Sequence, residues 1–174
     1  MNRGCTVWLT GLSGAGKTTT AGAVRDSLAA KGRAAVVIDG DDLRRGLSAD
    51  LGFSAADRDE NIRRAGEIAL LLNRQGVVAV VSLISPRAAA RSRVRARHAT
   101  QDLAFVEVYV ATPIEVCEQR DTKALYQRAR AGEAIHLTGV DDPYEAPESP
   151  DIVISTEESS PAEVALAIIS VITP

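Results

Sequence analysis

The sequence has few aromatic residues, few cysteines and no excess of positive charge. Among its 174 residues only two are cysteine, and aromatic residues make up 3%. Cys5 and Cys117 lie far apart, and they form neither a Cys-x-x-Cys pair nor a metal-ligand cluster with His98 and His136. We therefore expect two reduced thiols, and neither a disulfide framework nor a structural metal site.

Charge and hydropathy exclude two further classes of protein. The formal net charge is -3 and the pI is about 5.4, so the chain has no global attraction for nucleic acid. No segment approaches the roughly 18 apolar residues that a membrane span needs. The N-terminus also has no apolar stretch that ends at a cleavage site. These absences favour a cytoplasmic, soluble protein that binds neither nucleic acid nor membrane.

Short β-branched segments alternate with helical patterns from one end of the chain to the other. This alternation is typical of parallel strands joined by crossover helices, and continuous apolar segments such as residues 77–81 suit strands covered on both faces. The pattern predicts a single domain over residues 1–174, a three-layer α/β sandwich with a five-stranded parallel sheet. The expected strands are Thr6–Thr10, Ala35–Asp39, Val77–Ser82, Ala104–Val110 and Ile152–Ser155.

Two of the helices have readable starts. Ser54 and Asp57 form an approximate capping box before an apolar repeat of helical spacing, which Gly76 ends. Ser160 and Glu163 stand in the same relation at the start of the final helix. Both helices are therefore expected to begin at these residues. Between them in the sequence lies a loop-rich region.

That region, approximately residues 120–150, is charged and contains glycine and proline without a clear strand. In an α/β domain an insertion of this length is more often functional than structural. We expect it to form a lid over a ligand site, and it is called the lid segment below.

One motif indicates phosphate binding. The pattern G-x-x-x-x-G-K-[ST] lies between an expected strand and an expected helix, and it is matched in full by Gly11, Leu12, Ser13, Gly14, Ala15, Gly16, Lys17 and Thr18. The glycines let backbone N–H groups surround phosphates at a helix N-terminus. Lys17 can reach the β- and γ-phosphates of ATP, and the Thr18 hydroxyl can ligate Mg²⁺. The motif predicts a P-loop nucleoside triphosphate hydrolase fold.

Two further observations narrow the class of P-loop protein. The base-reading Asn-Lys-x-Asp motif of GTPases is absent. Instead the second expected strand runs into Asp39 and Asp41, which places carboxylates where open α/β sheets bind ligands. One carboxylate can hold the metal ion and another can orient or deprotonate an attacking hydroxyl. A small-molecule kinase follows from this arrangement, with a solvated Asp-Gly turn as the alternative.

The motifs together resemble the adenylyl-sulfate kinase family over nearly the whole chain. The matching segments are residues 8–19, Asp39-Gly40-Asp41, Leu43-Arg44, Leu51-Gly52-Phe53-Ser54, Asp57-Arg58, Glu60-Asn61-Ile62-Arg63-Arg64, Ile84-Ser85-Pro86, Asp121, Lys123, Leu125-Tyr126, Ala129-Arg130, Thr138-Gly139 and Asp141-Asp142-Pro143-Tyr144-Glu145. The resemblance implies a Mg²⁺-dependent, homodimeric enzyme that converts ATP and adenylyl sulfate (APS) to ADP and 3'-phosphoadenylyl sulfate. It also implies a functional link to an ATP sulfurylase.

The resemblance assigns roles to single residues. The catalytic residues are Lys17, Asp39, Asp41 and Ser85, the metal ligands are Thr18 and Asp39, and ATP is bound by residues 11–18 together with Thr19. The APS-binding residues are Asp41, Arg44, Phe53, Arg58, Asn61, Ile84, Ser85, Lys123 and Leu137, with the Phe53 ring stacked on the adenine. The resemblance also leaves open a relay in which Ser85 is phosphorylated as an intermediate. We expect direct in-line transfer, because facing sites need no covalent relay.

The chain departs from the family pattern at three positions. Ala124 stands where the family usually has glycine, Leu137 where it has phenylalanine, and Arg87 where it has an aromatic residue. Two alternatives therefore stay open: a related kinase for another nucleotidyl anhydride or phosphoramidate, and a non-catalytic nucleotide-binding domain. We interpret the arginines after Pro86 as a solvated helix face; they are Arg87, Arg91, Arg93, Arg95 and Arg97.

Overall fold

Five parallel strands form the central sheet of the computed structural model, which describes residues 4–121, 123–133, 136–157 and 159–172. The strand order is β2-β3-β1-β4-β5, and every pair of neighbours is parallel. The strands are β1 (Cys5–Thr10), β2 (Ala35–Asp39), β3 (Val78–Ser82), β4 (Ala104–Val110) and β5 (Ile152–Ile154). The predicted parallel sheet is confirmed, with strand ends within one residue of expectation.

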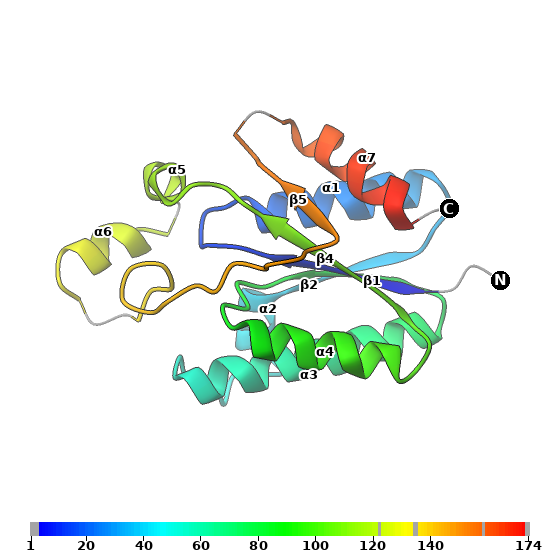
Figure 1. Ribbon diagram of the computed structural model, residues 1–174, viewed down its shortest axis with the longest axis horizontal. Helices are drawn as coiled ribbons and strands as arrows, with labels where there is room; N and C mark the ends of the chain where they lie inside the picture. The colour runs from blue at the N-terminus through cyan, green and yellow to red at the C-terminus, as the bar shows by residue number, and fades with distance from the viewer. Residues whose placement is uncertain (1–3, 122, 134–135, 158, 173–174) are drawn as a thin grey trace.

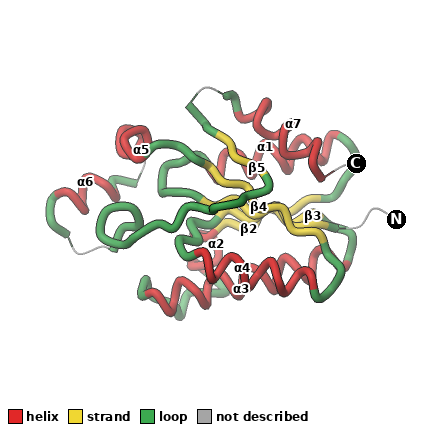
Figure 2. The backbone as a smooth tube through the Cα atoms, viewed as in Figure 1, coloured by secondary structure: helices red, strands yellow, loops and turns green. Residues whose placement is uncertain are grey.

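Helices cover both faces of the sheet, and together they complete the three layers (Figure 1). On one face lie α1 (Lys17–Ala30) and α7 (Pro161–Ile172), and on the other α3 (Ala55–Arg74) and α4 (Ala88–Ala99). The short helices α2 (Gly40–Arg45), α5 (Ile114–Arg120) and α6 (Leu125–Arg130) were not expected from the sequence. Figure 2 shows α5 and α6 beyond the end of the sheet, opposite the two termini.

The hydrophobic core is divided by the sheet into two clusters. Successive residues of a strand point to opposite faces, so Val7 and Leu9 of β1 belong to the cluster under α1 and α7, whereas Trp8 belongs to the cluster under α3 and α4. All three side chains are fully buried. Burial on both faces fixes the register of β1, because a slip of one residue would exchange the two sets of side chains.

Side-chain caps begin the two helices whose starts were predicted. The Ser54 hydroxyl accepts a hydrogen bond from the Asp57 backbone N–H at 3.2 Å, and α3 begins at the next residue. At α7, the Ser160 hydroxyl accepts from the Glu163 N–H at 3.3 Å while the Glu163 carboxylate accepts from the Ser160 N–H at 2.8 Å. Each cap satisfies backbone donors that the first helical turn leaves unpaired.

The interpretation of the α4 arginines as a solvated face is wrong for Arg91. Its side chain is 3% exposed and forms an ion pair with Glu107 of β4 at 2.7 Å. Arg95 is only partly exposed and pairs with Asp151 at 2.6 Å. The sequence pattern could not reveal this because the partners come from β4 and from the segment before β5. Among the described residues, no helix combines the length and the apolar character needed to cross a membrane.

Candidate functional site

The glycine-rich loop between β1 and α1 is held from its outer side by hydrogen bonds to its carbonyl oxygens. The Tyr126 hydroxyl donates to the Ser13 carbonyl at 2.8 Å, and the hydroxyls of Thr112 and Thr156 each donate to the Ala15 carbonyl at 2.9 Å. In a trans peptide the C=O and the following N–H point in opposite directions. The N–H groups of Gly14 and Gly16 therefore point to the inner side of the loop, as a phosphate cradle requires.

Two glycines of this loop occupy positions where any other residue would be strained. Gly14 has φ 76°, and a Cβ added to it would lie 2.9 Å from the carbonyl oxygen of Cys117. Gly16 has φ 98° at the N-cap of α1, and its Cβ would lie 3.0 Å from the Thr156 side chain. Only glycine combines a left-handed backbone with such a close approach.

The Lys17 side chain folds over the loop. Its ammonium donates to the carbonyl oxygens of Gly11 at 2.9 Å and Leu12 at 2.6 Å. Burial lowers the pKa of Lys17 to about 8, because desolvation disfavours the charged form. These carbonyls bear only partial charge, so a phosphate oxygen would be a stronger partner for the ammonium.

Thr18 and Asp39 meet where the P-loop approaches the end of β2. The Thr18 hydroxyl donates to one Asp39 oxygen at 2.7 Å and lies 3.2 Å from the Ser82 hydroxyl at the end of β3. The other Asp39 oxygen accepts from the Asp41 N–H at 2.9 Å, so Asp39 is the N-cap of α2. The residues form the start of a helix instead of a simple Asp-Gly turn. A hydroxyl and a carboxylate at this separation are suitable oxygen ligands for Mg²⁺ beside phosphates.

The lid segment reaches the site through Lys123. Its ammonium forms an ion pair with Asp41, although the two residues are 82 positions apart in the chain. Next to it, Ala124 has φ 54°, a left-handed conformation that glycine would adopt without steric cost. The departure from the family pattern at Ala124 therefore falls on a backbone position that favours glycine.

Arg44 and Phe53 lie together on the surface near the start of α3. Phe53 is 57% exposed, which is unusual for so large an apolar side chain, and the Arg44 guanidinium lies 4.4 Å from its ring centroid. Arg44 also donates to the Gly52 carbonyl at 2.7 Å. An exposed ring stacked against a cation offers a flat surface to a base, and Phe53 does not belong to the core.

Arg58 connects α3 to the lid segment. Its guanidinium donates to the Phe53 carbonyl at 2.8 Å and to the Thr138 hydroxyl at 2.5 Å, and it also bonds the His136 carbonyl. An ion pair with Asp142 at 3.1 Å completes its contacts. One side chain thus holds the segment around Phe53 against the segment around Leu137.

The remaining predicted site residues are mostly buried. Asn61 is 3% exposed, and its Oδ1 has no hydrogen-bond partner among the described residues, which is rare for a buried amide oxygen. Ile84 offers its carbonyl to the Thr10 hydroxyl at 2.7 Å, and Ser85 has φ 41°. Leu137 is 5% exposed and belongs to the core cluster under α1 and α7, so here its side chain packs against protein.

Sequence reasoning missed the residues that support the loop from outside. Besides Tyr126, these include Arg120, which donates to the Thr156 hydroxyl at 2.8 Å and to the Thr156 carbonyl at 2.9 Å. Thr156 lies beyond the lid segment and follows β5, so sequence distance hid its proximity to the P-loop. Only Tyr126 had a signal, because it belongs to one of the segments that carry the family resemblance.

Comparisons with known proteins agree with this geometry. The family model described as adenylylsulphate kinase matches residues 3–155. The adenylyl-sulfate kinase of Synechococcus sp. (strain JA-3-3Ab) is 55% identical over 161 residues, which are 92% of this chain and 89% of that protein. The corresponding protein of Paraburkholderia xenovorans (strain LB400) is 52% identical over 155 residues, which are 89% of this chain and 85% of that protein.

Solved structures give the same result. Mycobacterium tuberculosis APS kinase, in complex with AMPPNP and APS, is 47% identical and superposes with a TM-score of 0.96 over 100% of both chains. A gluconokinase from Sinorhizobium meliloti superposes with a TM-score of 0.60 at 19% identity, covering 97% of this chain and 93% of that one. The second likeness concerns the fold alone.

The lowered pKa of Lys17 makes a prediction about nucleotide binding. A bound triphosphate favours the charged ammonium, so the pKa of Lys17 in the complex lies above its value of about 8 in the free protein. Above about pH 8, binding must then take up a proton, and affinity for ATP should fall by up to about tenfold per pH unit. Titration calorimetry from about pH 7 to about pH 9.5 measures the slope.

The matched control is Lys17→Arg, whose guanidinium stays charged throughout this range. Its ATP affinity should be independent of pH, whatever its absolute value. A wild-type affinity that is constant over the range would contradict the uptake of a proton by Lys17 on nucleotide binding.

Proposed function

Because this chain belongs to the adenylyl-sulfate kinase family, we propose that it transfers the γ-phosphoryl group of ATP to the 3'-hydroxyl of APS, giving ADP and 3'-phosphoadenylyl sulfate. The observation that carries the proposal is the 2.7 Å contact between Thr18, at the end of the P-loop, and the Asp39 carboxylate. It joins the donor-phosphate cradle to a carboxylate that can hold the metal ion, next to Asp41, whose carboxylate can serve the acceptor hydroxyl.

The P-loop binds the phosphates of ATP. Its inward N–H groups and the N-terminus of α1 supply partial positive charge, which is fixed in place before the ligand arrives. Lys17 exchanges its bonds to the Gly11 and Leu12 carbonyls for bonds to phosphate oxygens. Charge that develops on the transferring phosphoryl group is thereby stabilised.

The residues at the junction of P-loop and β2 fit a magnesium ion. Mg²⁺ is bound by one or two protein oxygens together with substrate phosphates and water, and the Thr18 hydroxyl and Asp39 carboxylate are such a pair. When bound, the ion supplies neutralisation of phosphate charge. In the structure one Asp39 oxygen accepts from the Thr18 hydroxyl and the other from the Asp41 N–H, and these two bonds fix the orientation of the carboxylate.

Asp41 is the candidate to orient and deprotonate the acceptor hydroxyl. It is 58% exposed and pairs with Lys123, a contact that a bound acceptor can replace. Transfer is direct. The Ser85 hydroxyl accepts from the Trp8 indole N–H at 3.1 Å and lies 3.4 Å from the Leu83 carbonyl, and neither neighbour can act as a base.

The acceptor site combines cationic and apolar groups. Arg44 and Arg58 present planar donors to the phosphosulfate, and the exposed Phe53 ring stacks on the adenine. The Asn61 amide oxygen is buried and has no hydrogen-bond partner in the part of the chain that the structure describes, so it can accept a hydrogen bond from the ribose or its neighbourhood. Ile84 and Ser85 complete the site, and Lys123 reaches phosphate from the lid. Leu137 is packed in the core cluster under α1 and α7, so its side chain is not available to the adenine in this structure.

The lid segment excludes water when both substrates are bound. Arg58 and Lys123 tie it to α3 and α2 respectively, so closure brings cations toward the anionic ligands. Exclusion of water suppresses hydrolysis of ATP in place of transfer. The single-domain organisation, the homodimer, the link to an ATP sulfurylase and the cytoplasmic location stay predictions.

A panel of acceptors tests the proposed function. We expect ADP release, measured by a coupled assay with ATP present, to depend on APS and not on other nucleotides or on sugars. Turnover only with a different nucleotidyl anhydride or phosphoramidate would assign another acceptor. Nucleotide binding without turnover on any acceptor would make the chain a binding domain.

Asp39→Asn should lower kcat at least about a hundredfold with a smaller change in KM, because the carboxylate acts mainly in the transition state. The neighbouring Asp42→Asn is the matched control, since Asp42 is exposed and pairs only with Arg45 within α2 among the contacts of the described residues. Steady-state kinetics for both substrates distinguish the roles. A rise in KM alone would show that Asp39 binds substrate and does not take part in transfer.

Phe53→Ala should raise the KM for APS and leave the KM for ATP unchanged. Stacking of a base on an aromatic ring contributes about 1–3 kcal/mol, which corresponds to roughly a fivefold to hundredfold change. Leu71→Ala on α3 is the control. Leu71 is 60% exposed, so its substitution removes exposed apolar surface but no aromatic ring. If the KM for APS were the same in the wild type, Phe53→Ala and Leu71→Ala, the adenine would not stack on Phe53.

A further inference from the structure

Two segments that border the acceptor site are joined to each other. The loop after β3 contains Ser85 and Pro86, and the end of the lid segment contains Tyr144 and Glu145. The Glu145 N–H donates to the Pro86 carbonyl at 2.8 Å, and the Ala88 N–H donates to the Glu145 carboxylate at 2.7 Å. The loop and the returning lid segment therefore lie side by side although about 60 residues separate them.

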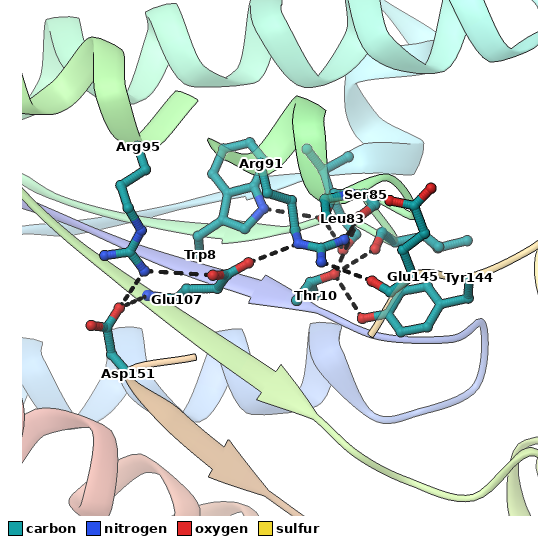
Figure 3. Close-up of polar contacts among 12 residues, drawn as sticks. Trp8, Thr10, Leu83, Ser85, Arg91, Arg95, Glu107, Tyr144, Glu145 and Asp151 are labelled. Atoms are coloured by element: carbon teal, nitrogen blue, oxygen red, sulfur yellow. Dashed lines mark hydrogen bonds and ion pairs between the residues drawn. The ribbon is translucent and has the colours of Figure 1, made fainter. Parts of the chain in front are cut away.

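Arg91 of α4 lies at this junction and uses all three of its guanidinium nitrogens. One terminal nitrogen donates to the Ser85 carbonyl at 2.7 Å and the other to the Glu145 carbonyl at 2.7 Å, while Nε donates to the Glu107 carboxylate at 2.7 Å (Figure 3). The side chain is 3% exposed. Arg91 thus connects the loop after β3, the lid segment and β4.

The loop that Arg91 holds has an unusual backbone conformation. Ser85 has φ 41°, in the left-handed region that residues other than glycine rarely adopt. Trp8 donates to its hydroxyl at 3.1 Å, and Thr10 fixes the neighbouring Ile84 carbonyl at 2.7 Å. A conformation of this kind persists only where the surroundings determine it, and such positions gather at functional sites.

The lid side of the junction is held in the same way. The Tyr144 hydroxyl lies 3.0 Å from the Thr10 hydroxyl, and its ring centroid lies 6.0 Å from the Arg91 guanidinium. Burial raises the pKa of Tyr144 to about 12, so the hydroxyl keeps its proton. Thr10 and Arg91 therefore each contact both the loop and the lid segment.

We propose that Arg91 is a positioning residue of the kinase, which fixes the Ser85 loop against the base of the lid segment so that both meet APS in one arrangement. The proposal rests on the proposed function. An ion pair that only stabilised the core would need Glu107 alone. Arg91 instead directs its two terminal nitrogens to backbone carbonyls of the two segments that border the acceptor, and neither belongs to the P-loop.

Arg95 provides a matched control one helical turn further along α4. It lies 3.5 Å from the same Glu107 carboxylate, pairs with Asp151 at 2.6 Å and donates to the Phe105 carbonyl at 3.3 Å. These contacts are with β4 and with the residue that precedes β5. The same arginine-to-lysine change can therefore be made at Arg91, where it affects the junction, and at Arg95, where it does not.

Arg91→Lys tests the proposal. A lysine ammonium can keep the charge beside Glu107, but it cannot bond three segments as a planar guanidinium does. We expect the KM for APS to rise about tenfold, because the bonds to the Ser85 and Glu145 carbonyls are lost. The KM for ATP should change less than about twofold, because neither carbonyl belongs to the P-loop. Hydrogen exchange of the Glu145 amide in the ligand-free protein should also become faster.

Two further variants separate positioning from stability. Arg95→Lys should leave the KM for APS and the exchange of the Glu145 amide at wild-type values. Val94→Ala removes core volume from α4, so it should lower Tm without changing either KM. The double variant Arg91→Gln with Glu107→Gln leaves no unpaired charge, and it should show the same change in the KM for APS as Arg91→Lys.

The proposal would be overturned if the KM for APS rose in proportion to the loss of Tm in every variant. It would also be overturned if the Glu145 amide exchanged at the wild-type rate in Arg91→Lys. Failure of the proposed function looks different. In that case the wild-type protein would not turn over APS, whereas the exchange experiment would still report whether Arg91 holds the two segments together.

Discussion

The site depends on the register between β2 and β3. Asp39 is paired with Ser82 across these parallel strands, and both side chains face Thr18 at the start of α1. Since side chains alternate along a strand, a slip of one residue would turn the Asp39 carboxylate to the other side of the sheet. Burial of the neighbouring apolar residues fixes this register, so the packing of the core also positions the carboxylate beside the phosphate loop.

Cations of the site are paired with groups of the protein when no ligand is bound. Lys17 bonds carbonyls of its own loop, Lys123 pairs with Asp41, and Arg58 pairs with Asp142. Each of these partners is weaker than a phosphate or sulfate, being a carbonyl or a partly exposed carboxylate. Ligand binding therefore exchanges one set of contacts for another, and no bare charge must be buried beforehand. The protein can have a net charge of -3 and still bind anions, because the attraction is local.

Much of the sheet and part of the site could be predicted from sequence, because their signals are local. Apolar segments predicted the strands, and the P-loop pattern predicted the glycine-rich turn between β1 and α1 in which Lys17 and Thr18 lie. The short helix α2 and the burial of Arg91 could not be predicted, because Asp39 as a cap and Glu107 as a counter-ion act only in the folded protein. The exposure of Phe53 and its contact with Arg44 likewise belong to the folded protein, and a propensity for burial cannot anticipate them.

Arg58 couples the position of the lid segment to the start of α3. The same guanidinium bonds the segment that carries Phe53 and the part of the lid that contains Thr138. Movement of the lid segment away from α3 must therefore break bonds to this one side chain. The ease with which the lid opens is thus set in part by an arginine that belongs to the rigid body of the protein and not to the lid itself.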